Sequence, residues 1–484
     1  MTTQDVRRDA SCRKFLARFQ SDRSGNVAVI FALSAVVLLL AIGAAVDVGR
    51  WLHARDQTMA AIDAALLAGG RYLQTQSKDT AGALAMARKF YDQNVTSRIP
   101  VTNDTITFTV ADNGMAITAS GNAFLKTPFL QLASIDKLPL INTATAEFSK
   151  AEIAVGGNGG ENLEVSMMLD VTGSMCNSPP SSNQQPCTSA NKLNALKDAA
   201  KDLVDIVVWK DQSKYTSKIA LVPFSEDVKL PTTTARDEAR GNKWPETQSK
   251  QNCSWFGCST TNYYRSDCMV ERTGSSKFND ASPNNGSKAV TPHYTEDYDT
   301  VGGSWWGGGT KVGKCTVNSD VVPLTSDQDK LKSAIDDLKA KGGTAGQVGT
   351  AWAWYVLSPN WSSLWDTSSQ PRPYGTEKLK KSAILMTDGE YNTSYDEKGI
   401  VANNDSGVNG SSSYQAEQLC SGMKAKGITV YTVLFGQKNN QSAINTMNKC
   451  ATDSTKFYNA EDNEQLKQAF RDIALKLSSL YLSK

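Results

Sequence analysis

The sequence predicts an α/β fold with a mostly parallel sheet and helices on both faces, preceded by a transmembrane helix and a small α+β region. From residue 163 onward, short apolar strands alternate with helical stretches, which is typical of a parallel α/β sheet. The strands are nearly continuous apolar runs, as expected for a sheet covered on both faces. Near the N-terminus, residues 27–46 carry no charge, and such a run is long enough to cross a ~30 Å hydrocarbon core as a helix.

Composition excludes several classes of function. The chain of 484 residues holds 51 basic and 49 acidic residues, whereas nucleic-acid-binding proteins normally show a basic excess. We therefore expect no nucleic-acid partner. Histidine is the most common general base and metal ligand, and the only two histidines are His53 and His293. This scarcity argues against zinc hydrolases and Ser-His-Asp enzymes, so we expect a protein that is not an enzyme.

The charges around residues 27–46 predict the orientation of this helix. Basic residues precede it, whereas the charges that follow it roughly cancel. The preceding ones are Arg7, Arg8, Arg13, Lys14, Arg18 and Arg23. The positive-inside rule then places residues 1–26 in the cytoplasm and the bulk of the chain outside it. A cleaved signal peptide is the alternative, but its apolar region is normally shorter, roughly 7–15 residues.

The segment around this helix resembles a known family. A basic tail, the run SGNVAVIFALSAVVLLLAIGAAVDVGR and an alanine-rich DAALLAGG follow one another over roughly residues 20–75, as in TadE/TadG-like Flp pilus-assembly proteins. Pilin-like members are cut after a glycine and carry a glutamate five residues later. Counting from Gly25, that place is Ile30, so we expect an uncleaved, single-pass anchor in a bacterial inner membrane, with the rest periplasmic or extracellular.

Beyond the anchor, residues 47–154 read as a helical stalk with a small α+β pilin-like region. The small residues of the stalk helix suit either contact with another helix or packing within its own domain. Two alternating strands flank Asn113-Gly114, a strong hairpin signal, and residues 138–148 read as a further strand. Residues 155–162 form a Gly/Asn linker.

The domain from 163 to 484 is read as a series of strands and helices. The strands are expected at 163–169, 218–224, 320–324, 381–387, 428–434 and 456–458. The helices are expected near 190–208, 327–340, 346–357, 412–426, 440–449 and 462–481.

Cysteine usage agrees with export. Eight of the nine cysteines follow the anchor, and an even number in an oxidising compartment suggests disulfides. Zinc binding is the alternative, but the sequence contains no CxxC pair and few histidines. Sequence alone does not fix the pairing. Proximity favours 176–187, 253–258, 268–315 and 420–450.

Three loops of the α/β region carry oxygen-bearing side chains. They contribute Asp170, Thr172 and Ser174 from LDVTGSM, Thr344 from KGGTAGQ and Asp388 from LMTDGEYN. In open α/β sheets, ligands bind outside the carboxyl ends of the strands. An all-oxygen site suits a divalent cation, Mg²⁺ first and Mn²⁺ or Ca²⁺ as alternatives. A carboxylate from a protein partner could complete the coordination shell. We expect both aspartates at the rim of the sheet, where the core does not need them.

This set of loops resembles the metal-ion-dependent adhesion site of von Willebrand factor A domains, whose first loop reads Asp-x-Ser-x-Ser. The resemblance spans about residues 163–484. It implies a fold of this type, with Asp170 and Asp388 at the acidic positions, Ser174 at the second serine and Thr344 in the middle loop. Thr172 stands where the family usually has serine and keeps the hydroxyl. The alternative is that these are ordinary turns in a domain without its metal.

An insertion at about 228–320 interrupts the α/β pattern. It holds four cysteines and many aromatic residues, and it leaves the sheet at the end of the second strand. We therefore expect it beside the proposed metal site. Its aromatics suit either a ligand-binding rim or the core of a disulfide-stapled subdomain. A GxxxxGK match at Gly308, Gly313 and Lys314 is rejected as a P-loop, because Cys315 replaces the Ser/Thr.

These observations favour a membrane-anchored, extracytoplasmic protein of a Tad/Flp-type pilus-assembly or adhesion system. Its expected partner is a pilus or envelope protein that offers an acidic residue to the metal. One alternative is a structural envelope protein with a vestigial metal site. A metal-dependent hydrolase is a weaker alternative, because Glu390 is its one obvious general base near the loops.

Overall fold

The chain divides into two compact units in the computed structural model. One comprises Met1–Glu152 with Leu482–Lys484, and the other comprises Ile153–Tyr481. The structure describes residues 24–75, 79–111, 116–141, 149–152, 161–176, 187, 190–209, 212–241, 244–255, 257–283, 289–302, 309–478 and 481–483. The expected basic tail up to residue 23, most of the expected linker and the Asn113-Gly114 turn lie outside these residues.

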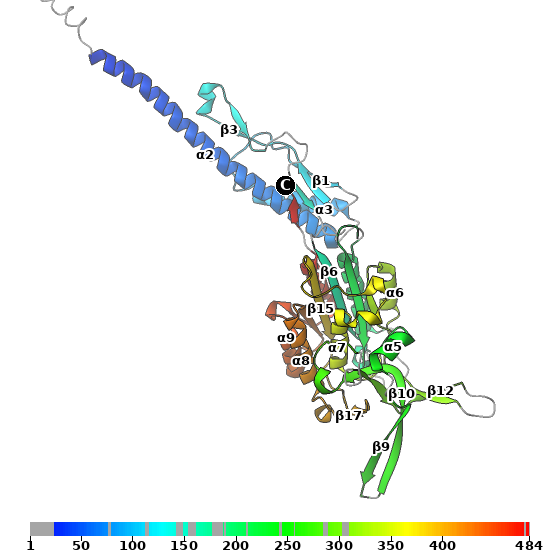
Figure 1. The fold of residues 1–484 in the computed structure, drawn as a ribbon. Coiled ribbons are helices and arrows are strands. Elements are labelled where there is room, and N and C mark those ends of the chain that lie inside the picture. Colours follow the sequence, from blue (N-terminus) through cyan, green and yellow to red (C-terminus); the bar gives the residue numbers. More distant parts are fainter. Residues whose placement is uncertain are drawn as a thin grey trace, which may run out of the picture. The chain divides into compact units, whose positions relative to one another are not determined.

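The first unit is built on one continuous helix, α2 (Ser24–Thr75) (Figure 1). Within it, residues 29–73 are long and apolar enough to cross a membrane. The large apolar side chains between Val27 and Leu40 are exposed. Beyond this part, small residues of the same helix such as Ala61 and Ala65 are buried. Gly69 lies so close to α3 (Thr80–Asn94) that an added Cβ would meet Ala87 at 3.0 Å, so the small residues pack within their own unit.

Two groups of strands complete this unit. The strands β1 (Thr107–Ala111), β2 (Ala116–Ser120), β5 (Ser149–Glu152) and β20 (Tyr481–Ser483) form one sheet in that order. The pairing of β1 with β2 confirms the predicted hairpin. A second hairpin joins β3 (Phe124–Lys126) to β4 (Lys137–Pro139), and between them lies the short 3-10 helix η2 (Leu130–Ala133). The strand expected at 138–148 is replaced by β4 and β5, and residues 142–148 are outside the described part.

The second unit contains the predicted α/β sheet, in the order β14-β7-β6-β15-β18-β19. The bounds are β6 (Asn162–Asp170), β7 (Ser217–Phe224), β14 (Val322–Thr325), β15 (Leu379–Thr387), β18 (Thr429–Phe435) and β19 (Phe457–Ala460). All neighbouring pairs are parallel except β14 with β7. From Leu163 to Asp170, every residue of β6 is buried, as the continuous apolar run predicts for a strand covered on both faces.

Helices cover both faces of this sheet. One core lies under α4 (Asn191–Val207), α6 (Gln328–Asp336) and α10 (Asn463–Leu477). The other lies under α7 (Gly346–Tyr355), α8 (Ser412–Ala425) and α9 (Gln441–Cys450). The fold class predicted from the sequence is therefore confirmed, and the predicted strands and helices match within a few residues at most ends.

The insertion forms a sheet of its own, which the sequence did not predict in detail. Its elements are β8 (Val228–Lys229), α5 (Thr233–Arg240), β9 (Thr247–Ser254), β10 (Gly257–Arg272), β11 (Val290–Thr295), β12 (Tyr298–Val301) and β13 (Thr310–Gly313). Figure 1 shows β9 and β10 extending from the unit as a two-stranded ribbon. The side chain of Trp255 at its tip is 98% exposed, whereas Tyr294 is buried. The buried Tyr294 fits the core of a subdomain, whereas the ligand-binding rim stays a prediction, and Phe256, Trp305 and Trp306 lie outside the described residues.

The four disulfides are those that proximity favoured. They join Cys176 to Cys187, Cys253 to Cys258, Cys268 to Cys315 and Cys420 to Cys450. The last one links α8 to α9 on one face of the sheet. Because all eight sulfurs are consumed, the zinc alternative fails for these cysteines.

Candidate metal site

Parallel neighbours in the sheet bring two of the three loops together. β6 ends at Asp170 and is followed by the 3-10 helix η3 (Gly173–Met175). β15 pairs with β6 in parallel and ends just before Asp388. The carboxyl ends of these strands therefore meet at the same edge, where α/β sheets bind ligands. The middle loop also reaches this edge, since Gly173 N donates to the carbonyl of Gly342 at 2.8 Å.

Asp170 organises the loops around it. Its Oδ1 accepts a hydrogen bond from Thr172 N at 2.9 Å. Its Oδ2 accepts from Thr387 Oγ1 at 2.7 Å and from Asp388 N at 3.3 Å. Asp170 and Asp388 are both fully buried. Both aspartates lie at the edge of the sheet, as expected. Three donors bond to the Asp170 carboxylate, and the expectation that the core does not need these residues stays a prediction.

The hydroxyl groups connect the remaining predicted ligands. Ser174 Oγ donates to Asp388 Oδ1 at 2.5 Å and lies 2.8 Å from Thr172 Oγ1. Thr344 Oγ1 and Ser174 Oγ would lie 3.8 and 3.7 Å from a Cβ added at Gly389, so both face the same small space. The structure thus brings Asp170, Thr172, Ser174, Thr344 and Asp388 together.

The site holds more negative than positive charge. Burial, together with the nearby charge of Asp388, raises the pKa of Asp170 to about 6. Lys192 supplies positive charge here, since its Nζ lies 2.7 Å from Asp388 Oδ2 and its side chain is 33% exposed. Sequence reasoning missed Lys192. Its place in the first turn of α4, the helix after β6, was the available signal, because that helix begins at the sheet edge where the loops lie.

A cavity of about 730 Å³ adjoins these loops. Its lining includes Ser174 and Thr344, and the insertion contributes Thr295, Glu296, Asp297, Lys314, Cys315 and Thr316. The expected position of the insertion beside the predicted site is therefore confirmed. Glu226, also missed from the sequence, joins the two parts, since its carboxylate accepts from Gly343 N and from Thr316 Oγ1, both at 2.9 Å.

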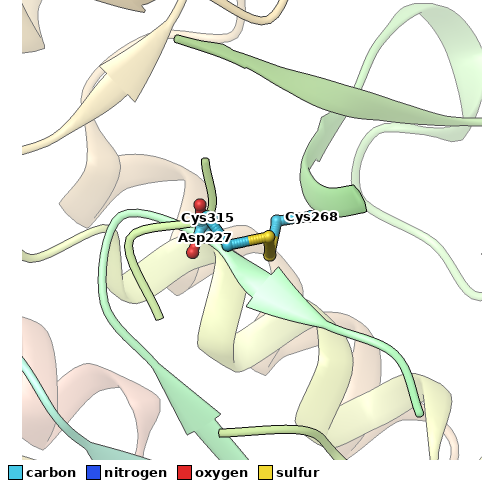
Figure 2. Close-up of side chains that lie close together, drawn as sticks. All are labelled: Asp227, Cys268 and Cys315. Carbon is cyan, nitrogen blue, oxygen red and sulfur yellow. A yellow bond between two sulfur atoms is a disulfide. The ribbon is translucent and has the colours of Figure 1, made fainter. Parts of the chain in front are cut away.

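A second acidic and sulfur-bearing cluster lies nearby and serves the structure. Figure 2 shows Asp227 beside the sulfurs of Cys268 and Cys315, which are joined in a disulfide and offer no thiolate. The carboxylate of Asp227 accepts from Thr316 N at 2.9 Å and Val317 N at 2.8 Å, and it lies 2.7 Å from Nδ1 of buried His293. These hydrogen bonds satisfy the buried carboxylate of Asp227. Because two of them come from Thr316 and Val317, the carboxylate holds the end of the insertion in place. The rejected P-loop match ends at this same disulfide.

Comparison with known families identifies two parts of the chain. A model described as Flp pilus-assembly TadE/G-like matches residues 25–72. The model of the von Willebrand factor type A domain matches residues 309–472. No curated protein matches the chain.

Solved structures show distant likeness. The vWF domain of the type V pili tip protein Mfa5 from Porphyromonas gingivalis is 13% identical with a TM-score of 0.36, over 66% of this chain and 95% of that one. The pilus adhesin RrgA from Streptococcus pneumoniae is 12% identical with a TM-score of 0.36, over 78% and 50%. The pilus adhesin SpaC from Lactobacillus rhamnosus GG is 11% identical with a TM-score of 0.32, over 77% and 34%. These values are too low to support a statement about function. What the family matches establish is that the chain joins a TadE/G-like segment to a von Willebrand factor type A domain.

Proposed function

We propose that this is a membrane-anchored, extracytoplasmic protein of a Tad/Flp-type pilus-assembly or adhesion system, which binds a protein partner through a divalent cation. The observation that carries the proposal is the convergence of two fully buried carboxylates and three hydroxyls at one sheet edge. The proposed ligands are Asp170, Thr172, Ser174, Thr344 and Asp388. The TadE/G-like segment supports the pilus context.

The donor set fits a hard cation. All five side chains offer oxygen, which Mg²⁺, Mn²⁺ and Ca²⁺ prefer. A bound divalent cation would neutralise the repulsion between Asp170 and Asp388 and would keep part of its charge for an acidic residue of the partner. The adjoining cavity offers room for that residue and for the chain that carries it.

The alternatives make different predictions about metal. A structural envelope protein with a vestigial site would take up no cation at these residues. A hydrolase would need a general base near the loops. His293 is buried against Asp227, and Glu390 is exposed in a turn. His293 is thus held in a buried contact and Glu390 is open to solvent, which favours binding over catalysis.

The cation is expected to stabilise the protein more strongly as pH rises. The folded-state pKa of Asp170 is about 6, above its ordinary value of 3.8, so its contribution to stability is lost as pH rises through about 6. Mg²⁺ binds the charged form of Asp170 and restores the lost stability. In the full chain in nanodiscs, we expect the Mg²⁺-induced rise in Tm to be larger at pH 7.5 than at pH 5, corresponding to about 1–3 kcal/mol more stabilisation by Mg²⁺ at the higher pH.

The titration of a second buried carboxylate must be distinguished from that of Asp170 in this experiment. Burial raises the pKa of Glu271 to about 7, and its carboxylate accepts from Gln347 and Gln415 away from the proposed ligands. Glu271→Gln should remove this second titration and leave the Mg²⁺ effect in place. An Mg²⁺ effect that is absent or independent of pH in both proteins contradicts the proposed site.

Partner binding is tested by capture. Nanodiscs carrying the full chain are incubated with envelope extract, in Mg²⁺ or in EDTA, and bound proteins are identified by mass spectrometry. We expect a pilus or envelope protein that is retained in Mg²⁺ and released by EDTA. Identical profiles in both conditions would favour the structural alternative.

The proposed topology places residues 1–26 in the cytoplasm and the chain beyond residue 46 outside it. Alkaline phosphatase, which is active only outside the cytoplasm, should be active when fused after residue 152 and inactive when fused before residue 20. The intact protein should retain residues 1–46 by mass spectrometry. The opposite activity pattern would refute the orientation.

A further inference from the structure

The β3–β4 hairpin is fastened to the end of the apolar run of α2. The backbone N–H groups of Phe129 and Leu130 both donate to Asp47 Oδ2 at 2.8 Å. Trp51 Nε1 donates to the carbonyl of Pro139 at 2.7 Å. A Cβ added at Gly43 would lie 2.8 Å from atoms of the Phe129 side chain. Because positions 43, 47 and 51 are four residues apart, they share one face of the helix.

This attachment fixes the height of the hairpin relative to a membrane. The uncharged run of α2 ends at residue 46, and Gly43 lies three residues before that end. At a rise of about 1.5 Å per residue, Phe129 contacts the helix roughly 5 Å inside the apolar run. A hairpin at that depth meets the membrane interface whenever the run spans the hydrocarbon core.

The tip of the hairpin carries the side chains that this position requires. Phe129, Leu132 and Ile135 are apolar, yet they are 45%, 75% and 42% exposed. Exposed apolar residues grouped in this way mark a membrane or protein contact. Continuity with the apolar surface of α2 favours the membrane.

Basic side chains lie next to the apolar tip of the hairpin. A cavity of about 700 Å³ is lined by Arg50, Lys126 and Lys137, with Asp136 as the acidic residue among them. Lys126 and Lys137 stand directly opposite each other in the hairpin, where like charges repel. An anion between them would relieve this repulsion. Lipid phosphates lie at this level of a bilayer, and Trp51 suits the same interfacial zone.

We propose that the tip of this hairpin, residues 127–136, inserts into the membrane interface, and that Arg50, Lys126 and Lys137 bind the phosphates of anionic lipid headgroups. The proposal rests on α2 crossing the membrane, which is the anchor of the proposed function. It gives the first unit a second point of attachment to the bilayer besides the helix itself.

The test uses a fluorescent label on the full chain in nanodiscs. Cys12→Ser leaves the eight disulfide-bonded cysteines, so that Leu132→Cys can be labelled alone with an environment-sensitive NBD dye. Leu132 is mostly exposed, so its replacement should not affect folding. Ala85→Cys on α3 is the control, because α3 packs near Gly69, about 35 Å along α2 from the end of the apolar run. We expect nitroxide groups on the acyl chains to quench more than half of the fluorescence at position 132 and little at position 85.

Lipid composition tests the headgroup assignment. Quenching at position 132 should be stronger with phosphatidylglycerol than with phosphatidylcholine alone. The paired change Lys126→Gln with Lys137→Gln should abolish that difference, and free inorganic phosphate should not replace the anionic lipid. Resistance of the chain to carbonate extraction, measured in parallel, shows that α2 is inserted, which separates failure of the anchor from failure of this proposal. With the anchor inserted, equal quenching at positions 132 and 85 overturns insertion of the tip, and an unchanged lipid dependence in the double variant overturns the headgroup site.

Discussion

Full-length protein carrying Asp388→Asn is expected to lose divalent-cation binding, with a drop in affinity of at least about 100-fold. The change removes one of two carboxylates from a site whose other proposed ligands are neutral hydroxyls. In EDTA the variant should still fold with stability close to that of the unchanged protein, because relief of the repulsion between two close carboxylates offsets the loss of the Lys192 ion pair. Calorimetric titration with Mg²⁺ and Mn²⁺ measures the binding, and thermal unfolding in EDTA measures the stability.

Other changes at the site separate metal binding from folding. Thr172→Ser keeps the hydroxyl and should leave affinity nearly unchanged, whereas Thr172→Ala should weaken it. Asp170→Asn should abolish binding like Asp388→Asn. Asp170→Ala should also lower stability, because three donors lose their acceptor in a buried place. Equal cation uptake by the unchanged protein and Asp388→Asn would show that the proposed ligand set is wrong.

The largest loss of stability is expected from Lys381→Met, near the opposite end of β15 from Asp388. Lys381 Nζ lies 2.5 Å from Glu164 Oε2 and 2.9 Å from the carbonyl of Leu357, and both side chains of the ion pair are at most 5% exposed. Removing the ammonium leaves a buried carboxylate without its counter-charge, which costs about 3–5 kcal/mol. Urea unfolding followed by tryptophan fluorescence reports on this unit, where the buried Trp352, Trp354 and Trp361 lie.

A matched control and a rescue define this second result. Lys438 pairs with Glu461 at 2.9 Å, but the two side chains are 67% and 43% exposed. Lys438→Met should therefore change stability by less than about 1 kcal/mol. Combining Lys381→Met with Glu164→Met should recover much of the loss, because the unpaired charge disappears. Similar effects of Lys381→Met and Lys438→Met would contradict the buried-pair argument.

Local signals explain what the sequence predicted. Strand β6 and strand β15 are apolar runs that end in turn residues, so their ends place Asp170 and Asp388 once a parallel sheet is assumed. Parallel pairing then brings the two aspartates together without knowledge of any side-chain contact. The disulfides follow proximity in the chain, which served here as a sufficient guide.

Side-chain contacts between distant positions explain what was missed. Asp47 looked like an ordinary charge after the anchor, but its carboxylate holds η2 more than 80 positions later in the chain. Lys192 and Glu226 have ordinary helix and loop surroundings, and their partners Asp388 and Thr316 come from other loops. The ribbon of β9 and β10 is polar along much of its length, so it lacks the apolar alternation by which a half-buried strand is recognised.

The position of β20 has a consequence for the order in which the chain folds. Its three residues complete the sheet of the first unit, yet in the chain they come after residues 153–480 of the second unit. The sheet of the first unit therefore cannot be finished until residues 153–480 have been synthesised. Contacts between residues so far apart in sequence form slowly, because a long loop must close first. The first unit, although it begins earlier in the chain, should reach its final form last, and a chain released before residue 481 would leave β5 as an open edge, a template for pairing with other chains.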